Sequence, residues 1–118
     1  MIFSTIEPPK TSDMNFFEIE DAKFGKLYVH KRPHLDQFLQ TVASFAEINV
    51  FTASIKEYAD PIIDNIDRQK KVVNRYYRDD CKKGQGDQIV KDMSVVAGFD
   101  KKRSIVVDDC DKVASMYR

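Results

Sequence analysis

The sequence predicts an α/β fold, a parallel sheet with helices on both faces and a β-hairpin insertion. Two short runs, residues 48–54 and 104–107, are largely apolar and of strand length, which is typical of strands buried on both faces. Segments with helical spacing lie between them, and this alternation implies a covered parallel sheet. At 118 residues, without repeats or linkers, we expect one domain spanning residues 1–118.

The first half of the chain predicts a hairpin followed by a helix. Residues 15–20 alternate around Phe17 and Ile19, and residues 26–31 follow a break, which indicates two strands with one solvated face. Pro33 suits the first turn of the next helix. That helix has apolar residues at helical spacing: Leu35, Phe38, Leu39, Val42 and Phe45.

After the strand at 48–54, Ser54 and Glu57 form an S-x-x-E pattern that predicts a capping box. The helix that it opens carries apolar residues on one face: Ile55, Ala59, Ile62, Ile63 and Ile66. We then expect a strand over 72–77, a hairpin turn at 84–86, a strand over 104–107 and a short final helix.

Composition excludes several classes of function. Lys+Arg and Asp+Glu balance at 19 each, so no overall field favours direct nucleic-acid or membrane binding. The basic clusters at 70–71 and 101–103 are short and typical of solvated faces. No apolar stretch approaches the roughly 20 residues of a membrane span, and no signal peptide is visible. Cys81 and Cys110 are too far apart for a zinc ribbon, so we expect a nuclear or cytoplasmic protein.

Polar side chains gather where the predicted strands end. Thr52 and Ser54 close one strand, and Asp108 and Asp109 close another. The carboxyl ends of parallel strands share one edge of a sheet, where ligands bind. Hydroxyl and carboxylate groups there suit a phosphate beside Mg²⁺, with Lys91 offsetting the charge. Alternatively, these side chains only cap helices.

Five segments in this order carry a resemblance to a known family: LYVHKRPHLDQFL, VFTASIKEYADPIID, YRDDC, VKDMS and IVVDDC. They resemble the FCP/SCP-type, or NLI-interacting-factor-like, phosphatases of the haloacid dehalogenase superfamily. The resemblance implies a HAD-like Rossmannoid fold. It also implies Mg²⁺-dependent removal of phosphate from phosphoserine or phosphothreonine in proteins such as the RNA polymerase II tail, through an aspartyl-phosphate.

The resemblance also implies roles for single residues. Thr52 would hydrogen-bond the phosphoryl oxygens, and Lys91 would hold the nucleophile and phosphate. Asp109 would ligate Mg²⁺, with Asp108 beside it. Arg78 and Tyr58 would line the phosphopeptide entrance, although Arg78 could instead form a surface ion pair with Asp79 or Asp80 and Tyr58 could simply pack.

The family's first motif, roughly DLDETLVHS, has no counterpart here. Residues 1–4 would align with its last four residues, and no D-x-D precedes the hairpin, so we expect the nucleophile to be absent and turnover lost. The motif's strand is central in the family's sheet, and its loss would leave a gap open to a partner or a second copy. A truncated product, a noncatalytic domain and an excerpt of a longer chain would each explain this.

Two further expectations concern binding. The hairpin residues Phe17, Ile19 and Leu27, with Ile55 and Tyr58 at the edge, would form a shallow pocket for an apolar residue near the phosphoserine. As an alternative to catalysis, the chain would be a binding scaffold, as in the mitochondrial import-translocase receptor branch. Because that branch tends to lose the Thr of FTAS, Thr52 and Lys91 favour descent from a working phosphatase.

Overall fold

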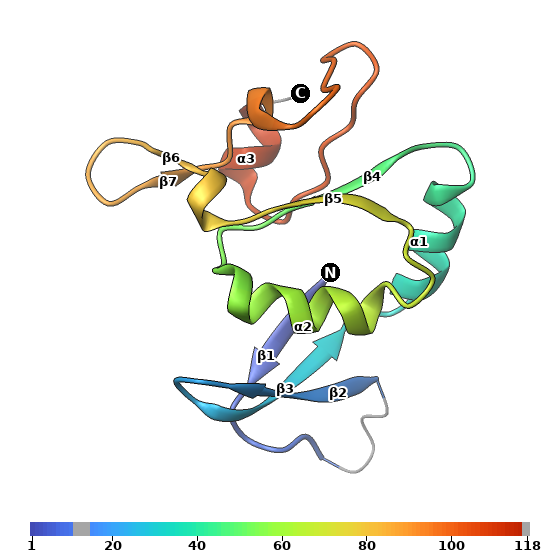
Figure 1. Cartoon of the computed structure of the whole chain (residues 1–118), viewed down its shortest axis with the longest axis vertical. Helices are drawn as coiled ribbons and strands as arrows, with labels where there is room; N and C mark the ends of the chain where they lie inside the picture. The colour runs from blue at the N-terminus through green and yellow to red at the C-terminus, as the bar shows by residue number, and fades with distance from the viewer. Residues whose placement is uncertain (11–14, 117–118) are drawn as a thin grey trace.

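The computed structural model describes residues 1–10 and 15–116, and its architecture is α/β, as predicted (Figure 1). One antiparallel sheet has the order β1-β3-β2, one parallel pair is β4-β5, and a small hairpin is β6-β7. The strands are β1 (Ile2–Thr5), β2 (Phe16–Asp21), β3 (Gly25–Lys31), β4 (Ile48–Phe51), β5 (Val72–Tyr76), β6 (Lys82–Lys83) and β7 (Ile89–Val90). The helices are α1 (Leu35–Ala43), α2 (Lys56–Ile66) and α3 (Asp111–Met116), with 3-10 turns at Arg78–Asp80 and Met93–Val95.

The predicted hairpin is confirmed, and it has an unpredicted third strand. β2 and β3 pair antiparallel, with Ile19 opposite Leu27. β1 pairs with the other edge of β3, where the sequence pattern predicts no strand. The backbone of β3 is therefore paired on both sides, and this places the first residues of the chain beside the hairpin.

Helix α2 lies between the two sheets and contributes to both cores (Figure 1). Ile62 packs against the antiparallel sheet, in a cluster with Ile19, Leu27 and Val29. Ile63 packs on the opposite side with Val50 of β4. The period of 3.6 residues turns neighbouring isoleucines toward different sheets, so one amphipathic helix holds the two sheets together.

The sequence prediction is wrong about how two helices, α1 and α2, begin. α2 begins at Lys56 with Ile55 at the N-cap, and no side chain caps it. The Ser54–Glu57 capping box does not form, because the Ser54 N–H donates to the Thr52 hydroxyl at 3.1 Å and its carbonyl accepts from the Arg78 N–H at 2.9 Å. These bonds hold Ser54 outside the helix. Pro33 lies before α1 rather than in its first turn.

The predicted strand at 104–107 is also wrong. Within the described residues this segment pairs with no strand, and Ile105 and Val107 are 90% and 76% exposed. Its apolar sequence favours a strand, but a strand needs a neighbour for its backbone groups. In the described part of the chain β4 pairs with β5 alone, and residues 104–107 pair with neither strand.

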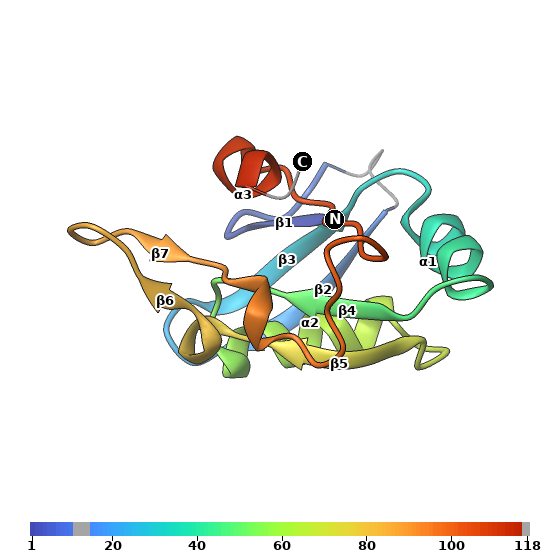
Figure 2. The same cartoon turned by 90° about the horizontal axis from the view of Figure 1, so that it is seen from above.

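The remaining elements agree with their predictions. The strand expected over 72–77 is β5, the turn at 84–86 joins β6 to β7, and the final helix is α3. β4 and β5 are parallel, so Thr52 and the end of β5 lie at one edge. The segment from β7 to α3, orange to red, runs along the side of β4 and β5 that faces away from α2 (Figures 1 and 2).

Candidate functional site

Thr52 lies at the carboxyl end of β4, in a backbone arrangement held by local bonds. Its N–H donates to the Tyr76 carbonyl at 2.9 Å, which extends the parallel pairing by one residue. Its hydroxyl oxygen accepts from the Ser54 N–H at 3.1 Å. Because the hydroxyl acts here as an acceptor, its own hydrogen can still donate to a ligand oxygen.

Lys91 and Asp108 form the least exposed salt bridge among the described residues. The Lys91 Nζ and Asp108 Oδ2 atoms are 2.7 Å apart, and the two side chains are only 17% and 10% exposed. The second carboxylate oxygen of Asp108 accepts from the Cys110 N–H at 2.8 Å. Removal of either charge would leave the other partly buried and uncompensated, so the pair fixes the end of the 104–107 segment against the chain after β7.

Cys81 connects Thr52 to Lys91 and Arg78. The thiol donates weakly to the Thr52 carbonyl at 3.9 Å. Burial raises the pKa of the Cys81 thiol, and the positive charges of Lys91 and Arg78 act in the opposite direction. The two cations therefore lie close enough to influence the same group beside Thr52. Three of the predicted site residues are thus gathered at the edge where β4 ends.

Arg78 has a defined structural role in this edge. Its side-chain Nε donates to the Ala53 carbonyl at 2.7 Å, and its backbone N–H donates to the Ser54 carbonyl. The alternative that it forms an ion pair with Asp79 or Asp80 has no support among the described contacts. Arg78 therefore ties the loop after β4 to the turn after β5.

Asp109 lies apart from Asp108 in its contacts. Its carboxylate is 3.5 Å from the Arg32 guanidinium and largely exposed. The backbone N–H of Arg32 donates to the Met1 carbonyl at 2.9 Å. Met1 therefore lies beside the backbone of Arg32, the residue whose side chain faces Asp109. Sequence reasoning missed Arg32, although an arginine in the segment quoted for the resemblance was a usable indication.

The donor set does not make a metal site on its own. Asp108 and Asp109 face different cations, and no group of three His, Cys, Asp or Glu side chains in residues 1–10 and 15–116 could hold a metal. Mg²⁺ requires near-octahedral oxygen ligands. Asp108 and Asp109 are the two carboxylates predicted to hold the metal, and each already pairs with a cation.

The hairpin residues predicted to line a shallow pocket lie mostly in the core. Ile19 and Leu27 are buried under α2, and Phe17 packs against the same cluster, because α2 covers the face that these three residues share. Tyr58 packs there too and bonds the Ser4 hydroxyl at 2.5 Å. Ile55 is exposed, away from this cluster. The predicted pocket is therefore not open.

Sequence reasoning also missed an ionic network on α2 and β5. Asp60 accepts from Lys56 at 2.9 Å, from Arg75 at 3.0 Å and from the Tyr77 hydroxyl. Arg75 also reaches Asp64 at 2.8 Å. The i,i+4 spacing of Lys56 and Asp60 could have indicated their ion pair from the sequence, whereas the long-range partners Arg75 and Tyr77 could not have been found in this way.

Comparison with known proteins decides the family. The model of the NLI interacting factor-like phosphatase family matches residues 1–118. The chain belongs to this family. As an NLI interacting factor-like domain, it resembles the nuclear envelope morphology protein 1 of Schizosaccharomyces pombe, with 43% identity over 83 residues, 70% of this chain and 17% of that protein.

Two other relatives of this NLI interacting factor-like domain cover more of it. The zebrafish (Danio rerio) CTD nuclear envelope phosphatase 1B is 38% identical over 106 residues, 89% of this chain and 42% of that protein. The human carboxy-terminal domain RNA polymerase II polypeptide A small phosphatase 1 is 34% identical over 109 residues, 92% and 41% of the two chains. The chain thus spans less than half the length of these relatives.

A solved structure supports the fold of the domain. A variant of the fission yeast RNA polymerase II CTD phosphatase Fcp1, bound to beryllium fluoride, superposes with a TM-score of 0.67. It is 22% identical and covers 95% of this chain and 35% of that one. The match confirms the predicted HAD-like α/β fold. No helix in the described part of the chain is long and apolar enough to cross a membrane.

Proposed function

We propose that this domain recognises phosphoserine or phosphothreonine in a protein, as the phosphate-binding half of a phosphatase site. The observation that carries the proposal is the partly buried Lys91–Asp108 pair, because the charge of Lys91 acts on Cys81, whose thiol contacts the Thr52 carbonyl at the end of β4. A partly buried cation next to a hydroxyl donor suits a phosphoryl group, whose oxygens accept hydrogen bonds and carry negative charge. Thr52 would donate its hydroxyl hydrogen, and Lys91 would supply the charge.

Hydrolysis requires a nucleophile that these 118 residues do not supply upstream of the hairpin. In the aspartyl-phosphate mechanism, a carboxylate oxygen bonds to phosphorus as the bond from phosphorus to the serine oxygen breaks, and a second carboxyl gives that oxygen a proton. We propose that a polypeptide of these 118 residues binds phosphoprotein without hydrolysing it. Asp109 would become a Mg²⁺ ligand only beside the carboxylates of a D-x-D segment. Substrates of the RNA polymerase II tail type and a nuclear or cytoplasmic location belong to the same proposal.

The test adds the missing segment to the chain. We would place Asp-Leu-Asp-Glu-Thr directly before Met1, so that residues 1–4 keep their alignment with the last four residues of the family's first motif. A matched control would carry Asn-Leu-Asn-Glu-Thr. We expect Mg²⁺-dependent release of phosphate from a phosphoserine peptide with the first version only.

A second comparison tests the binding residues. In the extended chain, Lys91→Ala should lower kcat/KM by at least ~100-fold, because electrostatic stabilisation of transferring phosphate is lost. Lys83→Ala, an exposed lysine of β6, should change it less than about twofold. Phosphopeptide binding without turnover in the extended chain would support the scaffold alternative. No binding in any version would refute the proposal.

A further inference from the structure

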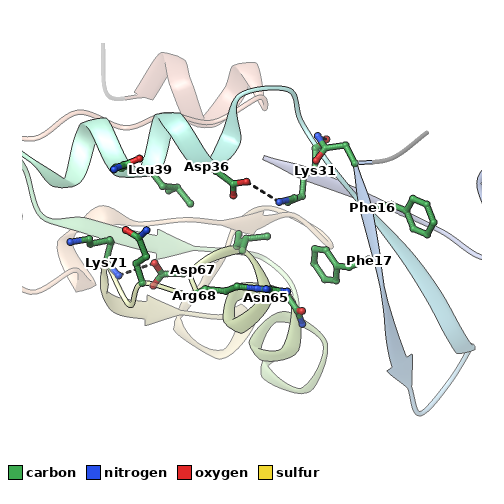
Figure 3. A pocket seen from close by; sticks show the side chains of 13 residues that line it. Phe16, Phe17, Lys31, Asp36, Leu39, Asn65, Asp67, Arg68 and Lys71 are labelled. Carbon is green, nitrogen blue, oxygen red and sulfur yellow. Dashed lines mark hydrogen bonds and ion pairs between the residues drawn. The ribbon is translucent and has the colours of Figure 1, made fainter. Parts of the chain in front are cut away.

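A cavity lies at the opposite end of the parallel strands from Thr52. It has a volume of about 490 Å³ and lies between α1, the start of β2 and the turn from α2 to β5 (Figure 3). Because β5 begins at Val72, directly after this turn, the cavity is separated from the Thr52 edge by the length of β5, about 15 Å. None of the residues proposed to bind phosphate lines it.

The floor of this cavity is apolar. Phe17, Leu39 and Ile66 line it, and they belong to one packed cluster. Leu39 and Ile66 are largely buried, so the apolar surface is recessed rather than displayed on a convex face. A recessed apolar floor of this kind accepts an inserted side chain.

The rim of the cavity carries surplus positive charge. The lining holds the cations Lys31, Arg68 and Lys71 and the carboxylates Asp36 and Asp67, one net positive charge. Lys31 pairs with Asp36 at 3.0 Å, and Figure 3 shows both at the α1 side. Within the described residues, the side chains of Arg68 and Lys71 have no carboxylate within salt-bridge distance.

Among the described contacts, Asp67 forms no salt bridge with these two side chains, because backbone donors occupy its carboxylate oxygens. One oxygen accepts from the Lys71 N–H at 2.8 Å, and the other accepts from the Val72 N–H at 2.9 Å. The Asp67 carbonyl also accepts from the Lys70 N–H at 3.0 Å. The turn is therefore held in one conformation, with Arg68 and Lys71 exposed at the mouth of the cavity.

We propose that this cavity is a docking site for an acidic segment of a partner protein, with one apolar side chain inserted between α1 and α2. The apolar floor would take a leucine or phenylalanine, and Arg68 and Lys71 would pair with carboxylates beside it. A membrane surface fits less well, because lipid headgroups would meet the two cations without filling the recessed floor. The proposal does not depend on phosphate binding at Thr52 and Lys91.

Fluorescence polarisation tests the proposal with the 118-residue chain and a fluorescein-labelled acidic peptide, GEEDLFEDG. We expect saturable binding. R68Q/K71Q should weaken it about tenfold, since two ion pairs with the peptide are lost. The matched control K101Q/K102Q removes two lysines from another exposed turn and should leave the affinity unchanged. A peptide with Leu-Phe replaced by Ser-Ser should bind at least about tenfold more weakly.

Three outcomes would overturn the proposal. An equal loss in K101Q/K102Q would mean that charge alone attracts the peptide. Equal affinity for the Ser-Ser peptide would mean that the apolar floor is not used. Binding to phosphatidylserine vesicles that R68Q/K71Q abolishes, without peptide binding, would assign the two cations to a membrane surface. Lys91→Ala should not change the affinity for the unphosphorylated peptide, so this result is separate from the phosphate-binding test.

Discussion

Asp60→Asn should destabilise the protein at neutral pH and have a much smaller effect near pH 2. Asp60 lies on α2 and accepts hydrogen bonds from Lys56, Arg75 and Tyr77, so it joins the helix to β5 and to the residue after it. Partial burial raises its pKa, but the hydrogen bonds from Tyr77, Lys56 and Arg75 outweigh this and hold the pKa at about 2, below the ordinary 3.8.

The size of the effect follows from that pKa. Each pKa unit corresponds to about 1.4 kcal/mol, so the lowered value would stabilise the folded state by about 2 kcal/mol. The Asp60 side chain is 27% exposed, and solvent screening reduces the interaction. We therefore expect Asp60→Asn to lower the free energy of unfolding by about 1–2 kcal/mol at pH 7.

The pH dependence has a definite sign. A carboxyl with a lowered pKa in the folded state stabilises the protein fully above its unfolded pKa and loses this contribution as pH falls through the folded pKa. The difference in free energy of unfolding between wild type and Asp60→Asn should therefore be constant at pH values more than about one unit above 3.8. It should shrink toward zero as the pH falls through about 2. Urea unfolding curves at a series of pH values measure it directly.

Asp64→Asn is the matched control. Asp64 lies one turn further along α2 and pairs with Arg75 at 2.8 Å, but its side chain is 66% exposed. An exposed pair of this kind contributes under about 1 kcal/mol. A difference for Asp60→Asn that stays the same from pH 7 to pH 2, or one no larger than that for Asp64→Asn, would refute the assigned role of Asp60.

Three further outcomes are expected from denaturant unfolding. Ile62→Ala should cost about 2–4 kcal/mol, because Ile62 is 4% exposed and packs under β2 and β3. Ile55→Ala, at the exposed N-cap of the same helix, should cost under about 1 kcal/mol, and equal losses would contradict the burial of α2. Ile105→Ser and Val107→Ser should each change stability by less than about 0.5 kcal/mol, and a larger loss would show that 104–107 is paired or covered. Arg78→Ala should cost about 1 kcal/mol through the lost bond to the Ala53 carbonyl, and retention of stability in Arg78→Ala but not Arg78→Lys would argue against it.

Local patterns in the sequence predicted those elements whose partners are also local. The alternation around Phe17 and Ile19 predicted β2, because its partner β3 follows after a short turn. The spacing of Ala59, Ile62 and Ile63 predicted α2 correctly. The resemblance of five short segments predicted the family, and the structure pairs two of the residues it singled out, Lys91 and Asp108.

Tertiary structure alone decided which predicted strands are paired and which apolar residues are buried. Residues 104–107 have the composition of a strand but lie unpaired, because hydrogen bonding between strands needs a neighbour that no local pattern reports. Ile19 and Leu27 could face a ligand or a core, and only the placement of α2 over them determines that they are buried.

The sequence by itself thus determined the family, the α/β class and the residue types at the edge where β4 ends. The structure decided that Asp109 faces Arg32 while Asp108 faces Lys91, and that the turn after α2 presents Arg68 and Lys71 at a cavity. The reason is physical: secondary structure depends on side-chain periodicity along the chain, whereas burial and charge pairing depend on which elements meet in space.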